Sequence, residues 1–457
     1  LLQLTSPIKG TDSGIINSII KTAVVPPVLL AVAAVLCYLF IVRGMYALED
    51  LPVKKIPRWS KICIEVVMVV FFLHTVQIQG TEIGMWDYIQ SVRESSDFYE
   101  KEYVNPAKVK MTFPKEKKNL IYIFMESMES SYADKEDGGT MEDNYIPNLT
   151  KLARENVQFT DKKDGKVGGP VCLEATAYTA GGLIAQTSAI NLKVMNSGAV
   201  SDSFLPNLTA LGDILNKQGY NQMFLCGSDG DFAGRDAYFK THKDYQIEDY
   251  KAAIKEGDIP KDYKVYWGHE DKVLYERAKK NLKKLSKEGK PFNLTMLTVD
   301  THFPNGYICD LCENKYDTTY GNAVACADRQ VYDFVQWIKK QDFYEDTTII
   351  IAGDHTSMVD TGSKFWKSLS NDYQRTVYNA IINPQCAYKK KVTTKRKFST
   401  MDMFPTTLAA LGVEIDGNKL GLGTNLFSGE ETLREELGAN YINKELKRND
   451  KMYNQFY

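Results

Sequence analysis

Short apolar runs rich in β-forming residues alternate with stretches of helical spacing, and this alternation constrains the fold of the chain more than any other feature. The apolar runs lie at residues 119–125, 221–226, 292–299 and 347–352. The stretches with helical spacing lie at residues 178–185, 205–219, 270–286 and 399–412. Runs that are apolar throughout are typical of strands buried on both faces. The alternation therefore predicts an α/β domain with a mostly parallel sheet flanked by helices.

Polar side chains of catalytic type follow these predicted strands. Glu126 comes directly after the first run, and Asp354 and His355 follow the last run after one glycine. His302 follows the run at 292–299, and Arg235 comes soon after the run at 221–226. Ligands of parallel sheets bind beyond the carboxyl ends of the strands. We therefore expect these five side chains to lie close together.

Glu126, Asp354 and His355 are the predicted metal ligands. A carboxylate at the end of a buried strand needs a cation or hydrogen bonds to remain charged. Asp354 and His355 can reach one ion only if the chain turns, and Gly353 permits a turn. Mixed oxygen and imidazole ligands suit Mn²⁺ or Zn²⁺ better than Ca²⁺. The alternative interpretations are a helix cap or surface acid for Glu126 and a chance dipeptide for Asp354 and His355.

The segment CLEATAYTAGG carries the predicted nucleophile, Thr176, just before the helix expected at 178–185. A hydroxyl side chain at this position is also an ordinary helix cap. Thr179, three residues later, is an alternative nucleophile, and Glu174 resembles a further ligand. We expect Arg235 to bind a phosphate group, because its guanidinium matches phosphate oxygens. His302 is expected to bind the same group or to act as a general acid.

The beginning of the chain predicts a membrane region. Residues 23–42 carry no charge and match the thickness of a bilayer, and residues 62–80 form a second apolar run that contains Glu65. The intervening loop is basic, which predicts that it faces the cytoplasm and that the rest of the chain lies outside. Buried helices of a soluble domain are the alternative. The expected organisation is a membrane region at 1–80, a connector at 81–114, an extracellular catalytic domain at 115–430 and a tail at 431–457.

Six of the eight cysteines would lie on the outer side, where disulfides persist. Cys309 and Cys312 form a CxxC pair, and Cys326 follows fourteen residues after Cys312. A disulfide within this set of three, holding a loop, is the favoured interpretation. A zinc site is the alternative, although no second CxxC is present.

Several motifs together resemble a known family. They are NLIYIFMES, a threonine before a helix of small residues, FAGRD, THFP, GDH, and DMFPTTLAALG followed by LGLGTNLF. In this order, over about residues 115–428, they are similar to the lipoteichoic acid synthase and phosphoglycerol transferase family. That family belongs to the alkaline phosphatase and sulfatase superfamily, so the resemblance implies a sulfatase-like fold.

The resemblance implies that Glu126, Thr176, Asp354 and His355 hold a divalent metal, with Mn²⁺ expected before Mg²⁺ or Zn²⁺. Thr176 would be the nucleophile, Arg235 and His302 would hold the glycerol phosphate group, and His302 would protonate the leaving oxygen. The implied donor is phosphatidylglycerol in the cell membrane. The implied acceptor is an envelope polysaccharide, or glycerol phosphate of a teichoic-acid type chain.

The chain also departs from the family pattern. Polymerising lipoteichoic acid synthases have a tryptophan where this chain has Ala233, which favours addition of single units to a glucan or cell-wall polysaccharide. Cys172 is followed by Leu, Glu, Ala and Thr, so the nucleophile motif of sulfate-ester hydrolases is absent. A phosphoethanolamine transferase, a related hydrolase and a non-catalytic envelope-binding protein remain alternatives. The net charge of −2 gives no basis for nucleic-acid binding.

Overall fold

The structure, a computed structural model, describes residues 25, 28–33, 35–37, 39, 58–82, 85, 86, 89, 93–163, 165–193, 203–243 and 245–457. The chain divides into two compact units, Leu1–Ser95 and Ser96–Tyr457. The second unit therefore includes residues that the sequence assigned to a connector and to a C-terminal tail.

The first unit contains the helix α4 (Arg58–Glu82). Large apolar side chains such as Val67 and Phe72 are exposed along this helix. Within the described residues, no helix combines the length and the apolarity that a membrane crossing requires. The crossing predicted at 62–80 falls on α4, where Glu65 and His74 interrupt the apolar run, and it is not confirmed. The crossing predicted at 23–42 lies partly outside the described residues.

The second unit is built on a sheet that has six strands in its described part, in the order β5-β4-β6-β3-β7-β8. Five strands are parallel and only β8 is antiparallel, so the predicted mostly parallel sheet is confirmed. The strands are β3 (Asn119–Met125), β4 (Asn221–Cys226), β5 (Gln246–Glu248), β6 (Phe292–Leu297), β7 (Thr347–Gly353) and β8 (Asn379–Ile382). The four predicted strands coincide with β3, β4, β6 and β7.

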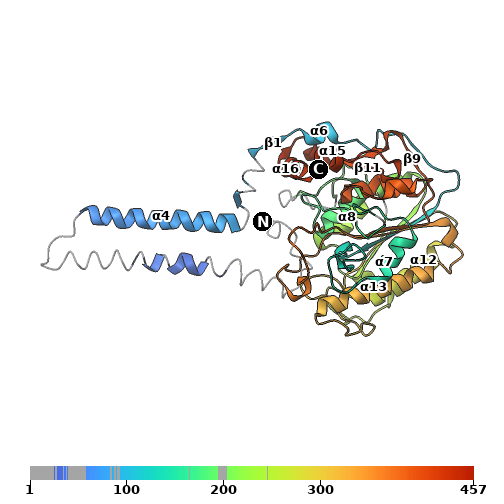
Figure 1. The fold of residues 1–457 in the computed structure, drawn as a ribbon, viewed down its shortest axis with the longest axis horizontal. Helices are drawn as coiled ribbons and strands as arrows, with labels where there is room; N and C mark the ends of the chain where they lie inside the picture. Colours follow the sequence, from blue (N-terminus) through green and yellow to red (C-terminus); the bar gives the residue numbers. More distant parts are fainter. Residues whose placement is uncertain are drawn as a thin grey trace. The chain divides into compact units, whose positions relative to one another are not determined.

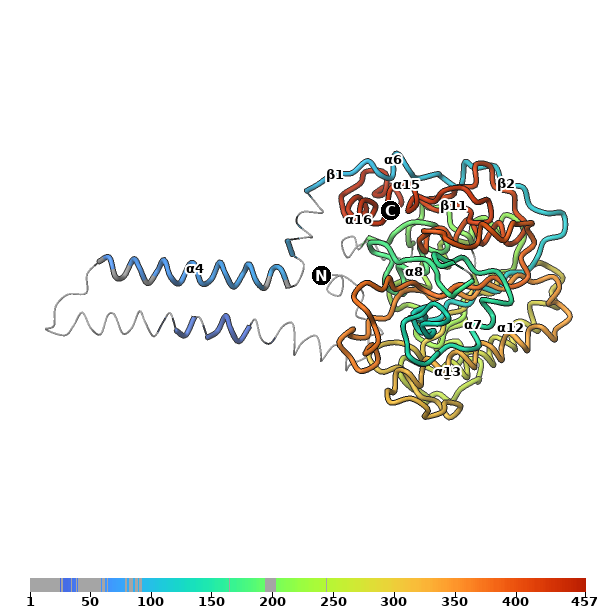
Figure 2. The backbone as a smooth tube through the Cα atoms, viewed as in Figure 1, coloured from blue at the N-terminus to red at the C-terminus, as the bar shows by residue number. Residues whose placement is uncertain are grey.

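Side chains along β3 alternate between two hydrophobic cores, one on each face of the sheet. Tyr122 and Phe124 join one core, whereas Ile121 and Ile123 join the other. Helices cover both faces, as Figures 1 and 2 show. The first face carries α8 (Thr179–Ser188), α9 (Leu211–Lys217) and α14 (Met403–Ala410), and the second carries α7 (Pro147–Glu155), α12 (Asp271–Leu285) and α13 (Thr319–Ile338). Strands buried on both sides explain why the predicted runs are apolar throughout.

Segments from both ends of the unit pack into the first core. Tyr99 is buried against Tyr453 and Phe456, and its backbone N–H donates to Asp450 at 3.0 Å. The remaining helices are α6 (Phe98–Glu102), α10 (Arg235–Thr241), α11 (Tyr250–Glu256), α15 (Leu433–Leu437) and α16 (Ala439–Lys447). The two-residue strands are β1 (Ser95–Ser96), β2 (Met111–Thr112), β9 (Glu414–Ile415), β10 (Lys419–Leu420), β11 (Gly423–Thr424) and β12 (Asn449–Asp450).

A disulfide joins Cys312, in the loop before α13, to Cys326 within α13. The bridge lies within the set of three cysteines that the sequence indicated, so the prediction of a disulfide holding a loop is confirmed. Cys172, Cys226, Cys309 and Cys386 of the same unit are free thiols.

Candidate active site

The carboxyl ends of β3, β6 and β7 meet at one edge of the sheet. The parallel register places Phe124 opposite Leu297 and Met125 opposite Gly353. The residues that follow are then joined by hydrogen bonds between loops. The backbone N–H of Glu126 donates to Thr298 Oγ1 at 2.9 Å, and that of Ser127 donates to Asp354 Oδ1 at 2.8 Å. Glu126 and Asp354 are therefore held by the ends of adjacent strands.

Glu126, Asp354 and His355 form a buried cluster with the composition of a metal site. One ligand atom from each lies within 4.8 Å of the other two. His355 Nε2 is 3.4 Å from Glu126 Oε1 and 3.5 Å from Asp354 Oδ2. None of the three residues is more than 2% exposed. The structure thus brings together the three residues that the sequence predicted as ligands.

The hydrogen bonds of the cluster leave a position that suits a divalent cation. Asp354 Oδ1 accepts bonds from the backbone N–H groups of Ser127 and His355, but Asp354 Oδ2 is buried without a hydrogen-bond partner. The Nδ1–H group of His355 donates to the carbonyl of Thr356 at 2.8 Å, so Nε2 is the ring nitrogen that faces the carboxylates. Two buried carboxylates and an imidazole oriented in this way fit a Mn²⁺ or Zn²⁺ ion.

Burial and the charges of neighbouring residues shift the pKa values of all three residues. Burial lowers the pKa of His355, but the carboxylates of Asp354 and Glu126 raise it to about 10 on balance. Burial, followed by the negative charge of Glu126, raises the pKa of Asp354 to about 8. Burial alone would raise the pKa of Glu126, but the neighbouring His355 holds it well below its usual range. The cluster therefore favours the binding of positive charge.

Thr179, rather than Thr176, presents a hydroxyl to this cluster. Thr179 Oγ1 donates to Glu126 Oε2 at 3.2 Å and lies 3.4 Å from His355 Nε2. Thr176 is fully buried, and its hydroxyl donates to the carbonyl of Leu173 at 3.0 Å while accepting from the N–H of the same residue. The structure therefore does not bring Thr176, the predicted nucleophile and metal ligand, into the cluster, because its hydroxyl closes a turn of its own loop. Thr179 was the alternative.

Local backbone geometry explains why Thr179, and not Thr176, faces the cluster. Ala175 has a φ of 57°, a left-handed conformation that reverses the chain and turns Thr176 inward. The helix α8 then begins at Thr179 and approaches the end of β7 closely. A Cβ atom on Gly182 would lie 2.1 Å from the carbonyl oxygen of Asp354, and Gln186 Nε2 donates to the carbonyl of Gly353 at 2.9 Å. The glycine pair that follows Thr179 in α8 is the sequence signal that could have indicated which threonine faces the cluster.

Glu174 does not contribute to the cluster. Its carboxylate lies 3.8 Å from Lys447 of α16, and its backbone N–H donates to Asn443. Although the sequence makes Glu174 look like a further ligand, its side chain faces Lys447 and not the cluster.

His302 follows β6 and lies beside the cluster. Its Nδ1–H group donates to the carbonyl of Phe303 at 2.8 Å, which leaves the lone pair of Nε2 available. Burial lowers the pKa of His302, while the negative charge of Glu126 acts in the opposite direction. A neutral imidazole near a carboxylate can accept or return a proton at neutral pH.

Arg235 begins α10 and is held rigidly at the same edge of the sheet. Its Nη2 group donates to Ser228 Oγ at 3.0 Å and to the carbonyl of Asp229 at 2.7 Å, and its Nε group donates to the carbonyl of Phe232. The guanidinium of Arg235 lies 5.4 Å from the centre of the Phe232 ring, and its positive charge contributes to lowering the pKa of His302. Arg235 and His302 thus follow strands that end at the same edge of the sheet as the metal-type cluster.

Aromatic side chains surround His302, a feature that the sequence reasoning missed. The rings of Trp267 and Phe303 lie 4.7 and 4.8 Å from its imidazole, and Phe232 lies 5.5 Å from Trp267. The hydroxyl of Tyr266 donates to the carbonyl of Phe303 at 3.1 Å, which fixes its ring beside the imidazole. These partly exposed residues, Phe232, Tyr266, Trp267 and Phe303, are called the aromatic wall below. The YW pair before His269 was the available signal.

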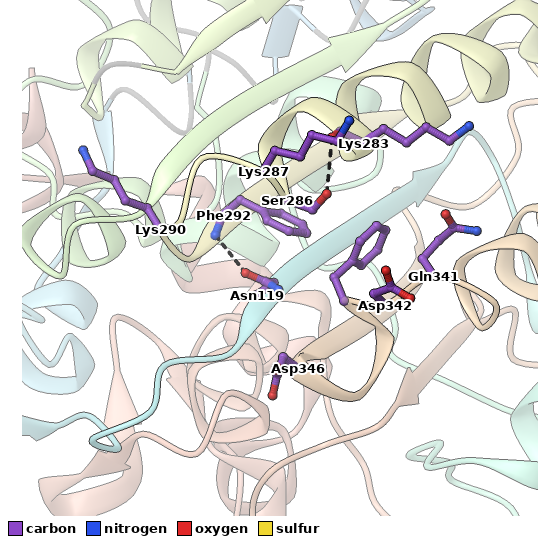
Figure 3. A pocket seen from close by; sticks show the side chains of 10 residues that line it. Asn119, Lys283, Ser286, Lys287, Lys290, Phe292, Gln341, Asp342 and Asp346 are labelled. Carbon is purple, nitrogen blue, oxygen red and sulfur yellow. Dashed lines mark hydrogen bonds between the residues drawn. The ribbon is translucent and has the colours of Figure 1, made fainter.

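A cavity of about 500 Å³ lies at the opposite end of the sheet. It is lined by Asn119 and Phe292, the first residues of β3 and β6, by Lys283 of α12, and by Lys287 and Lys290 of the loop that follows this helix (Figure 3). The cavity holds no cluster of the kind found at the carboxyl ends, and the rule for parallel sheets places ligands at the carboxyl ends instead. We therefore locate the candidate chemistry at the edge that carries Glu126.

Comparison with known proteins supports this description. The family model for sulfatases matches residues 118–413. Phosphoglycerol transferase I of Salmonella choleraesuis (strain SC-B67) is 32% identical over 340 residues, which cover 72% of this chain and 41% of that protein. The protein of the same name from Shigella flexneri gives the same values. The chain spans about two fifths of the length of these curated relatives.

Solved structures share the fold at lower identity. The lipoteichoic acid synthase LtaP from Listeria monocytogenes has a TM-score of 0.55 and 18% identity, with 70% of this chain and 79% of that chain covered. A protein of the alkaline phosphatase superfamily from Vibrio parahaemolyticus has a TM-score of 0.52 and 21% identity, with 75% and 78% covered. These likenesses confirm the sulfatase-like α/β fold that the motifs implied.

Proposed function

The chain belongs to the sulfatase family, and from this premise we propose that its second unit is a phosphoglycerol transferase. One observation carries the proposal: Thr179 Oγ1 lies within hydrogen-bond distance of Glu126 and His355 at the edge of the sheet where three strands end. A hydroxyl nucleophile in such a cluster suits transfer through a covalent intermediate. The similarity to proteins named phosphoglycerol transferase I supports glycerol phosphate as the transferred group.

In the first half of the reaction, Thr179 Oγ1 would form a bond to the phosphorus of phosphatidylglycerol. The bond from phosphorus to the diacylglycerol oxygen would break, and a glycerophospho-threonine would remain. Glu126 Oε2, which already accepts a hydrogen bond from the threonine hydroxyl, would orient it and take its proton. The fixed guanidinium of Arg235 would bind the phosphate oxygens, and His302 would protonate the departing diacylglycerol oxygen.

In the second half, an acceptor hydroxyl would attack the same phosphorus, the bond from phosphorus to Thr179 Oγ1 would break, and Thr179 would regain its proton from Glu126. His302 Nε2 would take the proton of the incoming hydroxyl, because the donated Nδ1–H leaves its lone pair free. The aromatic wall supports a sugar acceptor, because partly exposed rings offer flat apolar surface to the CH faces of a pyranose while their polar edges remain hydrated. The acceptor that fits is therefore an envelope polysaccharide or a teichoic-acid type chain.

Glu126, Asp354 and His355 would hold the divalent metal, with Mn²⁺ as the first candidate. When bound, the cation supplies positive charge that lowers the pKa of a neighbouring hydroxyl and offsets the charge of the transferred group. The buried Asp354 Oδ2 atom, which has no hydrogen-bond partner, supports this assignment. The first turn of α8 has no capping side chain, so its amide groups favour a phosphate near Thr179.

A lipid donor places this chemistry at a membrane surface. We assign residues 1–80 to a membrane-associated region and the second unit to the extracytoplasmic side, where envelope polysaccharides are found. The basic loop between the two apolar segments and the exposed apolar side chains of α4 support this assignment.

The test uses purified protein, Mn²⁺ and phosphatidylglycerol with a labelled head group. We expect diacylglycerol release together with label on the protein, and peptide mapping should find that label on Thr179. Label on Thr176 would contradict the assignment of the nucleophile. Release from phosphatidylethanolamine but not from phosphatidylglycerol would identify a phosphoethanolamine transferase instead. No release from either lipid would exclude both transferases.

A further inference from the structure

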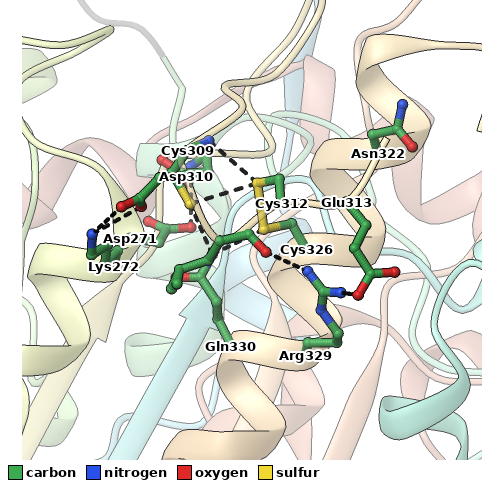
Figure 4. Close-up of a disulfide and its surroundings, with 12 residues drawn as sticks. Asp271, Lys272, Cys309, Asp310, Cys312, Glu313, Asn322, Cys326, Arg329 and Gln330 are labelled. Carbon is green, nitrogen blue, oxygen red and sulfur yellow. Dashed lines mark hydrogen bonds and ion pairs between the residues drawn. A yellow bond between two sulfur atoms is a disulfide. The ribbon is translucent and has the colours of Figure 1, made fainter. Parts of the chain in front are cut away.

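Three cysteines lie side by side in the loop after His302 and on α13. Cys312 and Cys326 form the disulfide, and the sulfur of the free Cys309 lies 3.6 Å from the sulfur of Cys312 (Figure 4). Cys309 and Cys326 are both buried, at 7% and 2% exposure. The third sulfur is therefore enclosed in contact with the bridge that the other two form.

Hydrogen-bond donors are directed at all three sulfur atoms. The backbone N–H of Cys309 donates to Cys312 Sγ at 3.3 Å. The side-chain amide of Gln330 donates to Cys326 Sγ at 3.5 Å and reaches Cys309 Sγ at 4.0 Å. Gln330 lies one helical turn after Cys326 on α13. Because nearby donors stabilise a thiolate, Gln330 can support either Cys309 or Cys326 when that residue is unbridged.

We propose that Cys309, Cys312 and Cys326 form an exchanging disulfide centre, in which Cys312 is bridged either to Cys326 or to Cys309. In the exchange, the Cys309 thiolate forms a bond to Cys312 Sγ and the bond from Cys312 to Cys326 breaks. Cys326 leaves as a thiolate and takes up the proton that Cys309 lost. One disulfide and one thiol are present before and after, so no oxidant or reductant is consumed.

The two bridges hold the loop in different ways. The Cys312–Cys326 bridge ties the loop to α13, whereas a Cys309–Cys312 bridge closes only the turn in which Cys312 N–H already donates to the Cys309 carbonyl at 3.1 Å. Arg329 of α13 donates to the carbonyl of Leu311 at 2.6 Å and would keep the loop near the helix in both states. Exchange would therefore loosen residues 310–318, a loop that begins shortly after His302, without releasing it.

The first experiment follows the exchange with N-ethylmaleimide on the oxidised full chain, in the absence of added thiol. After acid quenching and digestion, peptide mapping should find label on Cys326 as well as on Cys309, with a Cys309–Cys312 bridge in the Cys326-labelled molecules. Cys386 is a free thiol outside this set and serves as the internal reference for labelling. In Cys309→Ser, label on Cys326 should fall at least tenfold relative to label on Cys386.

N-ethylmaleimide could alkylate Cys309 faster than the disulfides exchange. A second variant tests the proposal in that case. Cys326→Ser, treated with oxidised glutathione, should form a Cys309–Cys312 bridge and lose both thiols. Two free thiols in that variant would overturn the proposal, as would equal labelling of Cys326 in the presence and absence of Cys309. Neither result depends on the transferase activity, so the outcome is separate from that of the proposed function.

Discussion

Thr179 Oγ1 lies 3.2 Å from Glu126 Oε2, although the two residues are 53 positions apart in the chain. The contact joins the first residue of α8 to the first residue after β3, and it directs a hydroxyl at the buried cluster of Glu126, Asp354 and His355. The nucleophile role proposed for Thr179 depends on that relationship.

Replacement of Thr179 should affect catalysis far more than replacement of Thr176. Thr179→Ala removes the nucleophile and should lower diacylglycerol release by roughly 10³-fold or more, whereas Thr179→Ser retains a hydroxyl and part of the activity. Thr176→Ala is the matched control. It removes two hydrogen bonds with Leu173 and should cost about 1–2 kcal/mol of stability while activity persists. Equal loss of activity in both alanine variants would contradict the assignment of Thr179.

Metal removal should destabilise the second unit. At a Mn²⁺ concentration of about 100 times its Kd, binding should stabilise the folded state by roughly 2.7 kcal/mol, and a chelator should reverse the effect. Asp354→Asn retains the hydrogen bonds of Oδ1 but removes the charge, so the thermal shift with Mn²⁺ should disappear. Asp328→Asn is the control, because that buried carboxylate binds Asn148 and Leu149 instead. An unchanged shift in Asp354→Asn would place the metal elsewhere.

Acid should destabilise the fold through His269, a fully buried residue with an unpartnered Nε2 atom. Burial lowers the pKa of His269 from 6.5 to about 4. Between these pH values the unfolded chain binds more protons, so this residue lowers the free energy of unfolding by up to about 3 kcal/mol as the pH falls. Urea unfolding of wild type and His269→Gln at pH 7 and pH 4.5 measures the effect. The variant should lose less stability than wild type over this range.

The aromatic wall should affect the second half-reaction more than the first. Trp267→Ala should lower transfer to a glucan acceptor by about 3- to 10-fold, the range expected for loss of one ring contact, while diacylglycerol release continues. Trp337→Ala is the control, because that ring packs against Phe334 and Phe343. Phe343 lines the cavity at the opposite end of the sheet. Equal loss in both half-reactions for Trp267→Ala would show that the ring supports the fold of the site rather than the acceptor.

The approach of α8 to β7 depends on Gly182. Gly182→Ala would place a Cβ atom 2.1 Å from the carbonyl oxygen of Asp354, so the helix must shift and Thr179 must move with it. We expect a loss of about 1–3 kcal/mol of stability and a large loss of diacylglycerol release. Gly362→Ala should be tolerated, because its nearest neighbour would lie at 3.5 Å. Full activity in Gly182→Ala would show that the position of α8 is not critical.

The sequence predicted the four central strands well, because each is a run of apolar β-formers buried on both faces. It predicted less well the helix expected at 205–219, which begins only at Leu211, where Asp213 caps the backbone of Ala210. It also gave no sign of β8, a four-residue antiparallel edge strand. Short elements depend on partners that are distant in the chain, and local pattern does not contain those partners.

The sequence by itself determined that Glu126, Asp354 and His355 lie together, because each follows a buried strand and parallel strands end at a common edge. Only the tertiary structure decided which threonine faces that cluster. Thr176 and Thr179 lie in one short segment, and both suit the start of a helix. The left-handed turn at Ala175 directs the hydroxyl of Thr176 inward. The close approach of Gly182 to Asp354 brings the hydroxyl of Thr179 to the carboxylates.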